Sequence, residues 1–229
     1  MRIARVVTLL SAMAIAAPFA ATTATAAQGG GSNPGRGGGT VTCEFTPTPE
    51  NPSARPVRLP SKQAKAGGTV RATIETNYGP MVFDLVRDTA PCAVANLVHL
   101  AKADFYDDSQ CFRLTDTARL GVLQCGDLIR QEVGGPGYKF PDEVDGTETY
   151  PRGTIAMGNQ GPGTNGSEWF IVHSFANISP NYTVLGHQVS GFDVLDAIVA
   201  AGIADPDGDG PPAQPVVITD VRIDNRNHR

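Results

Sequence analysis

The sequence lacks an excess of positive charge. Lys and Arg together number 18 against 23 Asp and Glu, which gives a formal net charge of −5. The chain also has no run of like charges of the kind that forms binding tails. Because a nucleic-acid-binding domain presents a basic face to phosphates, this balance argues against nucleic acid as a partner.

The sequence also lacks the short motifs of metal and covalent catalysis. Its four histidines are scattered, and none forms the H-E-x-x-H pattern of zinc proteases. No serine lies in the G-x-S-x-G pattern of serine hydrolases. Residues 161–166 match G-x-G-x-x-G, but a strand-like segment follows them where a nucleotide site needs a helix. We therefore expect no cofactor and no metal.

One acidic segment is similar to the start of a calcium loop. Residues 205–210 read D-P-D-G-D-G, with carboxylates at alternate positions and glycine at the sixth. The twelfth position, which supplies a bidentate acid in such loops, is Val216. Because too few ligands remain, the sequence favours a solvated loop between a helix and a strand.

The N-terminal end has the features of an export signal. Arg2 and Arg5 precede an uncharged stretch, residues 6–27, and Ala24-Thr25-Ala26 provides a small-x-small cleavage site. The apolar centre is short for a membrane span, so we interpret residues 1–27 as a cleaved signal peptide rather than an uncleaved anchor. The mature chain is then secreted or held in the cell envelope, outside the cytoplasm, without a membrane span.

Only four cysteines are present, and their spacing excludes the paired C-x-x-C clusters of structural zinc sites. An exported chain folds in an oxidising compartment, so we expect two disulfides, with free buried thiols as the alternative. Four cysteines allow three pairings, and the spacing does not choose among them. The cysteines are Cys43, Cys92, Cys111 and Cys125.

Glycine and proline dominate the region after the signal. Residues 29–39 hold seven glycines in eleven positions, which is typical of a flexible tether. Residues 46–60 contain five prolines, which favour an extended spacer. We therefore assign residues 28–67 to a Gly/Pro-rich linker and residues 68–229 to one globular domain.

The globular part is predicted to be mainly β. From Thr69, apolar and polar residues alternate in two runs around a turn signal at 77–80, as in a β-hairpin. The apolar spacing becomes helical at 91–103 and at 191–201. Many short strands with two helices indicate a closed β-barrel, since closure removes exposed sheet edges. Further strands are expected at 153–158, 169–173, 183–186 and 216–219.

Several longer stretches together resemble the cyclophilin-type peptidyl-prolyl cis-trans isomerases, and most closely their exported actinobacterial-type members. The likeness covers about residues 69–222, and the order and spacing of its motifs agree throughout. The resemblance implies a closed eight-stranded antiparallel barrel capped by two α-helices, acting as a monomer on proline-containing polypeptides. The motifs are F-Y-D at 105–107, C-F-R at 111–113, L-Q-C-G-D at 123–127, G-G-P-G-Y at 134–138, F-P-D-E at 140–143, G-T-I-A-M at 153–157, and G-P-G-T-N-G-S at 161–167 with Phe170.

The resemblance implies rotation about X-Pro bonds without covalent chemistry. Amide resonance sets a barrier of about 18–20 kcal/mol, which an enzyme lowers by binding the twisted bond better than the planar forms. In the twisted state the prolyl nitrogen gains a lone pair, which a fixed guanidinium stabilises. Arg113 matches the family's catalytic arginine, and Gln124 matches the amide that holds it and contacts the substrate.

The substrate-binding residues follow from the same motifs. Asn159 matches the residue whose backbone pairs with the peptide before proline, and Phe170 matches the aromatic floor of the proline pocket. Val122 and Ile178 stand at matching wall positions, and Tyr182 stands where the family has a late pocket histidine.

This sequence departs from the family at two further predicted substrate-binding positions, Phe112 and Glu168, and at Gly121. Phe112 replaces a histidine beside the arginine, and Gly121 replaces a pocket aromatic, which predicts a shallow pocket. Glu168 replaces a glutamine and is expected to pair with Arg113 in competition with the substrate. These departures predict reduced or altered activity. The alternatives are a non-catalytic or weakly active proline-peptide-binding or chaperone module, and a structural adhesion domain.

The resemblance also suggests which cysteines pair. In this fold Arg113 and Gln124 lie on adjacent strands, which makes Cys111 and Cys125 cross-strand neighbours. The remaining pair, Cys43 with Cys92, would tie the spacer to the start of the first helix. In the chain-entropy model these disulfides contribute about 3 and about 4 kcal/mol respectively.

Overall fold

The computed structural model describes residues 39–224 of the 229-residue chain. The expected signal peptide, residues 1–27, and the tether up to residue 38 lie outside this range. No helix within residues 39–224 has both the length and the apolar character needed to cross a membrane.

The main sheet starts with the predicted hairpin. Strands β4 (Thr69–Thr76) and β5 (Gly79–Val86) pair antiparallel in unbroken register. Every second residue is buried along β4 and, from Met81 on, along β5, as the period of two predicted. Gly79 has φ +127°, a conformation that L-residues rarely adopt, so glycine suits the turn.

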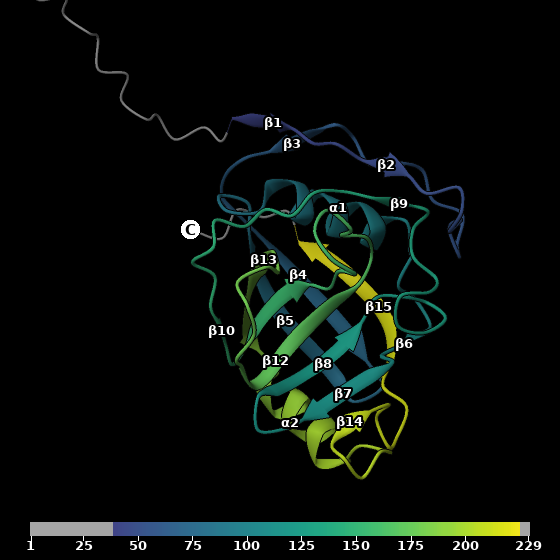
Figure 1. The fold of residues 1–229 in the computed structure, drawn as a ribbon, viewed down its shortest axis with the longest axis vertical. Helices are drawn as coiled ribbons and strands as arrows, with labels where there is room; N and C mark the ends of the chain where they lie inside the picture. The colour runs from purple at the N-terminus through teal and green to yellow at the C-terminus, as the bar shows by residue number, and fades with distance from the viewer. Residues whose placement is uncertain (1–38, 225–229) are drawn as a thin grey trace, which may run out of the picture. The chain divides into compact units, whose positions relative to one another are not determined.

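Eleven strands form this sheet, which is strongly curled (Figure 1) and packs one face against the apolar core. The fold is therefore mainly β with two helices, as predicted. Its other strands are β6 (Ser109–Gln110), β7 (Arg113–Asp116), β8 (Leu120–Cys125), β10 (Tyr150–Pro151), β11 (Thr154–Met157), β12 (Trp169–Ala176), β13 (Val184–Ser190), β14 (Asp209–Gly210) and β15 (Val217–Asp224).

The closed eight-stranded barrel is not confirmed, because within residues 39–224 the hydrogen-bonded strand order has two ends. It runs β14-β7-β8-β12-β11-β13-β5-β4-β15-β6, with β10 added beside β12. β6 and β7 follow each other in the chain, and the residues between them turn to different neighbours. Cys111 N donates to Val216 O (2.9 Å), whereas Phe112 N donates to Gln124 O (3.1 Å). The chain itself, rather than a ladder, therefore joins β6 to β7.

The two predicted helices are confirmed and lie at opposite ends of the sheet (Figure 1). Helix α1 (Pro91–Lys102) has proline in its first turn, and the Glu143 carboxylate accepts hydrogen bonds from Cys92 N (2.9 Å) and Ala93 N (2.8 Å). This carboxylate satisfies N–H groups that the helix itself leaves unpaired. Helix α2 (Phe192–Ala200) buries Leu195 and Ile198.

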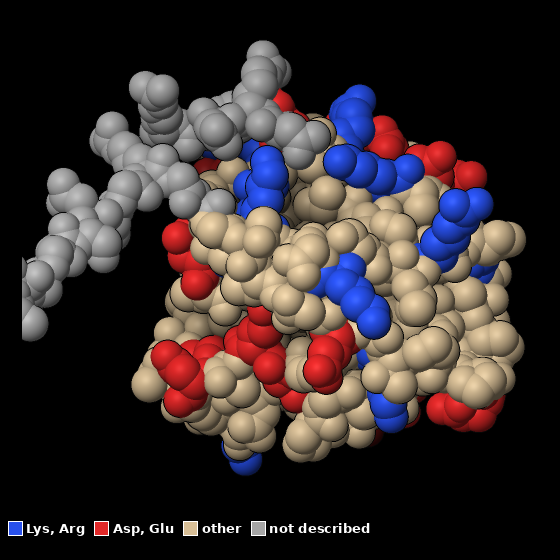
Figure 2. Space-filling view, turned by 90° about the horizontal axis from the view of Figure 1, so that it is seen from above, with Lys and Arg blue, Asp and Glu red and all other residues tan. Residues whose placement is uncertain are grey.

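Of the residues assigned to a linker, those that the structure describes, 39–67, are instead part of the compact unit, so the ordered fold does not begin near Gly68. Strands β1 (Thr40–Thr42) and β3 (Gln63–Lys65) pair with each other, and β2 (Thr46–Pro47) pairs with β9 (Tyr138–Lys139). We call residues 40–65 the strap. It lies over α1 in Figure 1, and Figure 2 shows this end of the molecule from above.

Apolar anchors explain why this proline-rich segment is ordered. Cys43, Phe45 and Ala64 are buried in the main core. The Phe45 ring makes edge-on contacts with Tyr138 and Phe140, at centroid distances of 5.6 and 5.5 Å. Composition predicted an extended spacer and missed these anchors, which outweigh the cost of ordering the chain.

Both predicted disulfides are confirmed. Cys43 bonds to Cys92 and Cys111 bonds to Cys125, which leaves no free cysteine within residues 39–224. The first disulfide ties the strap to the start of α1. The second joins β8 to the segment that leads into β7.

Candidate functional site

A cavity of about 250 Å³ opens on the outer face of the sheet. We call it the arginine cavity. It brings together eight of the nine residues predicted to act in catalysis or substrate binding, and Leu120, Gln131, Glu132 and Gly158 complete its lining. The eight are Arg113, Val122, Gln124, Asn159, Glu168, Phe170, Ile178 and Tyr182.

Strand register explains why these residues meet. Arg113 on β7 is directly opposite Gln124 on β8, which is opposite Phe170 on β12. Paired residues point to the same face of a sheet, so the cation, the amide and the aromatic ring form one row. Strands β8 and β12 are buried on both faces, which explains their nearly continuous apolar sequences.

The outer face carries its own small apolar cluster beside this row. Val122, Phe170 and Tyr150 are almost fully buried in it, and Ile178 and Tyr182 pack against them. The Phe170 and Tyr182 rings meet nearly at right angles, with centroids 5.7 Å apart. The cavity therefore has an apolar wall opposite its arginine.

Sequence reasoning missed Tyr150, which fixes the Tyr182 backbone. The Tyr150 hydroxyl donates to Tyr182 O (3.1 Å) and accepts from Tyr182 N (3.0 Å). The two residues are 32 positions apart. No local pattern indicates this contact, because β10 is only two residues long.

Arg113 is held on two sides. Its Nη1 donates to Gln124 Oε1 (2.9 Å), as the resemblance implied. Its Nε and Nη2 donate to the two carboxylate oxygens of Asp209, at 2.6 and 2.7 Å. The hydrogen bond to Arg113 lowers the pKa of Asp209, and the same contact raises the pKa of Arg113, so both groups stay charged at neutral pH.

The prediction that Glu168 pairs with Arg113 is wrong. The hydrogen bonds of the guanidinium go to Gln124 and to Asp209, a residue 96 positions away. Glu168 instead accepts a hydrogen bond from Gln124 Nε2. The amide of Gln124 thus lies between the cation and the carboxyl group, because its oxygen faces Arg113 and its nitrogen faces Glu168.

Glu168 forms a buried pair with a second carboxyl group, Asp127, and each is 6% exposed. Burial, followed by the charge of Asp127, raises the pKa of Glu168 to about 8. Burial also raises the pKa of Asp127. At neutral pH Glu168 therefore holds a proton and donates it to Asp127 in a hydrogen bond. In that form it resembles the glutamine that it replaces.

Gly121 does not line the arginine cavity. A methyl group built at Gly121 would overlap Ser174 Oγ and would lie 3.0 Å from the His173 ring. His173 is buried and makes a 2.7 Å hydrogen bond to Thr115 O. Ser174 and His173 therefore fill the space beside Gly121, and this position adds no wall to the arginine cavity.

Phe112 is the one predicted substrate-binding residue that does not line this cavity. It is half-buried in the segment between β6 and β7. Since neighbouring residues of an extended chain point to opposite faces, the position next to Arg113 is directed away from the row that forms the site.

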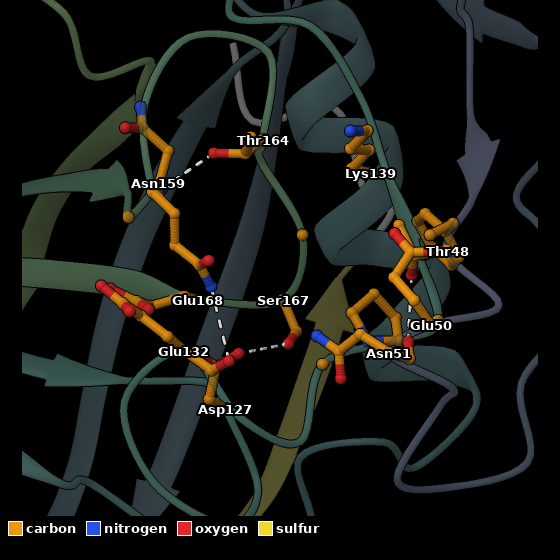
Figure 3. A pocket seen from close by; sticks show the side chains of 17 residues that line it. Thr48, Glu50, Asn51, Asp127, Glu132, Lys139, Asn159, Thr164, Ser167 and Glu168 are labelled. Carbon is orange, nitrogen blue, oxygen red and sulfur yellow. Dashed lines mark hydrogen bonds between the residues drawn. The ribbon is translucent and has the colours of Figure 1, made fainter.

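A second cavity of about 260 Å³ adjoins the first and shares Glu132, Gly158, Asn159 and Glu168 with it. Figure 3 shows Asp127, Ser167 and Glu168 on one side and strap residues on the other. Ser167 Oγ donates to Asp127 Oδ1 (3.0 Å). The strap thus contributes directly to the surface beside the site, which the linker assignment had excluded.

Asn159 lies on the rim between the two cavities. Its side-chain amide donates to Asp142 Oδ1 (3.1 Å) and to Asn181 O (3.2 Å). Its Oδ1 accepts a hydrogen bond from Gly161 N (3.1 Å). These contacts fix the start of the Gly-rich loop, which continues into strand β12 rather than into a helix.

Comparisons with known proteins agree with this architecture. The family model described as "Cyclophilin type peptidyl-prolyl cis-trans isomerase/CLD" matches residues 71–223. The chain is 39% identical over 199 residues to the "Probable peptidyl-prolyl cis-trans isomerase B" of Mycobacterium leprae, covering 80% of this chain and 67% of that protein. It is 38% identical over 197 residues to the Mycobacterium tuberculosis protein of the same description, covering 80% and 64%. The matched region thus spans about two thirds of the length of these relatives.

Solved structures give the same result. A crystal structure of a Cryptosporidium parvum cyclophilin type peptidyl-prolyl cis-trans isomerase superposes with a TM-score of 0.59 at 26% identity, covering 69% of this chain and 99% of that one. A second structure of that protein, in the presence of the dipeptide Ala-Pro, superposes with a TM-score of 0.58. Since the family model matches most of the described residues, including those of the arginine row, this chain belongs to the cyclophilin-type peptidyl-prolyl cis-trans isomerase family.

Proposed function

We propose that this chain speeds rotation about X-Pro bonds in proline-containing polypeptides outside the cytoplasm, with Arg113 as its catalytic group. The observation that carries the proposal is the placement of Arg113. Its guanidinium is fixed by Gln124 and Asp209 at the edge of a cavity whose opposite wall is apolar. A charged donor beside an apolar wall suits a substrate whose reacting nitrogen is part of an apolar ring.

The apolar wall would hold the proline ring. Phe170 forms the floor, and Val122 and Ile178 stand beside it. Burying the ring there removes apolar surface from water and orients the bond that must rotate. This contact is available to both planar isomers and to the twisted state, so by itself it provides binding rather than catalysis.

Arg113 would provide the difference between the planar and twisted states. As the bond twists, resonance is lost and the prolyl nitrogen gains a lone pair that can accept a hydrogen bond. A guanidinium that is already oriented can donate to it without reorganisation, and partial exclusion of water strengthens the contact. No bond is made or broken to the protein in this scheme.

The rim residue Asn159 would bind the peptide segment before proline. Its side chain is fixed by Asp142 and Asn181, so its backbone is held at the boundary of the two cavities. The segment would then continue toward the second cavity and the strap. We propose a monomer as the active form, because residues of one chain line both cavities; light scattering at working concentration tests this.

The two disulfides support action outside the cytoplasm. Disulfides persist in oxidising compartments and are rare in cytosolic proteins. This agrees with the export signal expected at residues 1–27. Detection of the chain in a culture or envelope fraction, shortened at its N-terminus, would support the proposed location, and retention in the cytoplasm would contradict it.

NMR exchange spectroscopy on a short Ala-Pro peptide tests the proposed activity. We expect the full chain to catalyse cis–trans exchange and Arg113→Ala to lose about 100-fold of the rate, the usual effect of removing one oriented donor. Arg71→Ala is the matched control, because Arg71 forms a similar two-point pair with Asp84 (2.8 and 3.1 Å) away from the site. Equal rates for Arg113→Ala and the wild type would remove the assignment, and peptide binding without exchange by the wild type would favour a binding module.

A further inference from the structure

Asp209 is the one charged partner of the Arg113 guanidinium among the hydrogen bonds and ion pairs of residues 39–224. It belongs to the acidic segment 205–210, which resembles part of a calcium loop in sequence. The segment's carboxylates are not gathered into a cation site, because Asp209 is paired with Arg113 and the Asp205 side chain accepts from Asp207 N (2.8 Å).

The backbone of this acidic loop is attached to the strand that carries the arginine. Strand β14 pairs with β7, so that Asp209 is opposite Thr115 and Gly210 is opposite Leu114. Asp116 N also donates to Gly208 O (2.8 Å). The loop therefore follows β7, and the Asp209 carboxylate is presented to Arg113 by a fixed backbone.

Two glycines make this attachment possible. Gly208 has φ +77°, where an L-residue is strained. A Cβ at Gly210 would lie 2.7 Å from Asp205 Cβ. The glycines on either side of Asp209 thus permit the tight loop, which explains their places in the D-P-D-G-D-G segment.

The two-point contact fixes the plane of the guanidinium. Arginine has five N–H donors, and three are used here: two by Asp209 and one by Gln124. Two of its N–H groups therefore have no hydrogen bond to residues 39–224. A paired fork has one orientation, whereas a free arginine samples many rotamers, so the two remaining donors keep a constant direction.

The ion pair between Arg113 and Asp209 is expected to add little to the folding stability of the chain. The Arg113 and Asp209 side chains are 25% and 43% exposed. Ion pairs with that much contact with water add little to folding stability, because water already solvates the separated charges. Orientation of the donor is the larger consequence of this geometry.

We propose that Asp209 is a positioning residue for the isomerase reaction, holding the Arg113 guanidinium so that its two remaining N–H groups meet the prolyl nitrogen in the twisted state. The inference rests on the proposed catalytic role of Arg113. The alternative is a damping role, in which the carboxylate would weaken the cation and its removal would raise the rate. The two roles therefore predict opposite changes in rate when the carboxylate is removed.

The test is peptide exchange by Asp209→Asn in the full chain, measured over a range of peptide concentrations. We expect kcat to fall about tenfold while KM changes less than twofold, because the contact acts on the twisted state. The Arg113 side-chain Nε–Hε signal should shift and broaden in NMR spectra. Asp84→Asn removes a matched two-point pair with Arg71 and should leave kcat unchanged.

Two further variants test whether Asp209 acts by positioning Arg113, by its charge alone or by supporting the local structure. Asp209→Glu keeps the charge but displaces the carboxylate, so positioning predicts an intermediate kcat, whereas damping predicts the wild-type value. In an Arg113→Lys background, Asp209→Asn should change kcat less than twofold, because lysine cannot make the two-point contact.

The possible failures are distinguishable. A kcat for Asp209→Asn equal to or above the wild type would overturn the positioning role, as would an equal loss in both backgrounds. A wild-type kcat for Arg113→Lys and Arg113→Ala would instead overturn the proposed function of Arg113. If Asp209→Asn failed to fold, the Asp209→Glu comparison would still decide between positioning and damping.

Discussion

The buried carboxyl group of Glu168 should make the stability of the chain depend on pH. Burial, followed by the charge of Asp127, raises its pKa from the usual 4.5 to about 8. The folded state thus binds this proton more tightly than the unfolded state does. Its contribution to stability is complete below pH 4.5 and is lost as the pH rises through about 8. At about 1.36 kcal/mol per pH unit, the interval sets an upper limit of about 5 kcal/mol on the loss in free energy of unfolding.

Glu168→Gln removes this proton without changing the shape of the side chain. The amide can still accept from Gln124 and donate to Asp127, as the protonated carboxyl does. Urea unfolding of the wild type should give a free energy that falls between about pH 4.5 and pH 8 and levels off above pH 8. For the variant it should change far less over that interval. Glu44→Gln, at an exposed position on the strap, is the control and should follow the wild type.

Catalysis should show the same dependence. Because its raised pKa keeps Glu168 mostly protonated at neutral pH, wild type and Glu168→Gln should exchange a proline peptide at rates within about twofold of each other. Above pH 8 the ionised carboxylate would repel Asp127 and compete for Gln124 and Arg113, and the wild type should slow while the variant does not. A direct pair between Glu168 and Arg113 would instead have predicted a faster variant at neutral pH, but Gln124 and Asp209 take the hydrogen bonds of the guanidinium. Parallel pH profiles for the two proteins, in both unfolding and exchange, would refute the reasoning.

Two further predictions concern the support of the site. The double variant Cys111→Ser with Cys125→Ser should lose about 3 kcal/mol of stability in urea unfolding. It should also slow peptide exchange, since the disulfide joins the segments that carry Arg113 and Gln124. If the urea unfolding of the wild type were unchanged under reducing conditions, that result would count against this prediction. Gly121→Ala should lower the free energy of unfolding by about 1–3 kcal/mol through overlap with Ser174. Adding Ser174→Gly should recover part of that loss. If Gly121→Ala left the free energy of unfolding unchanged, the sheet would have adapted to the methyl group, against this prediction.

Local patterns were sufficient for much of the fold. The alternation from Thr69 predicted the β4–β5 hairpin, and the change of apolar period predicted both helices. The family motifs placed Arg113 beside Gln124 and suggested both disulfides. These features depend on short sequence patterns or on motifs whose order is retained along the chain.

Contacts between distant segments could not be read in the same way. Asp209 reaches Arg113 across 96 positions because β14 adds to β7, and a two-residue strand leaves no periodic signal. The choice of Asp127 rather than Arg113 as the charged partner of Glu168 depends on how two loops pack. The strap was missed for a related reason, because composition describes average chain behaviour and not a single buried ring such as Phe45.

The central claim is that Arg113 stabilises the twisted X-Pro bond more than it stabilises the bound planar peptide. One NMR titration of an Ala-Pro peptide against Arg113→Ala measures both binding and exchange in the same sample. We expect chemical shift changes of the peptide to show affinity within a few-fold of the wild type, because the apolar wall around Phe170 is intact, while catalysed exchange is lost. Exchange at the wild-type rate, or a loss of affinity that accounts for the whole loss of rate, would contradict the claim.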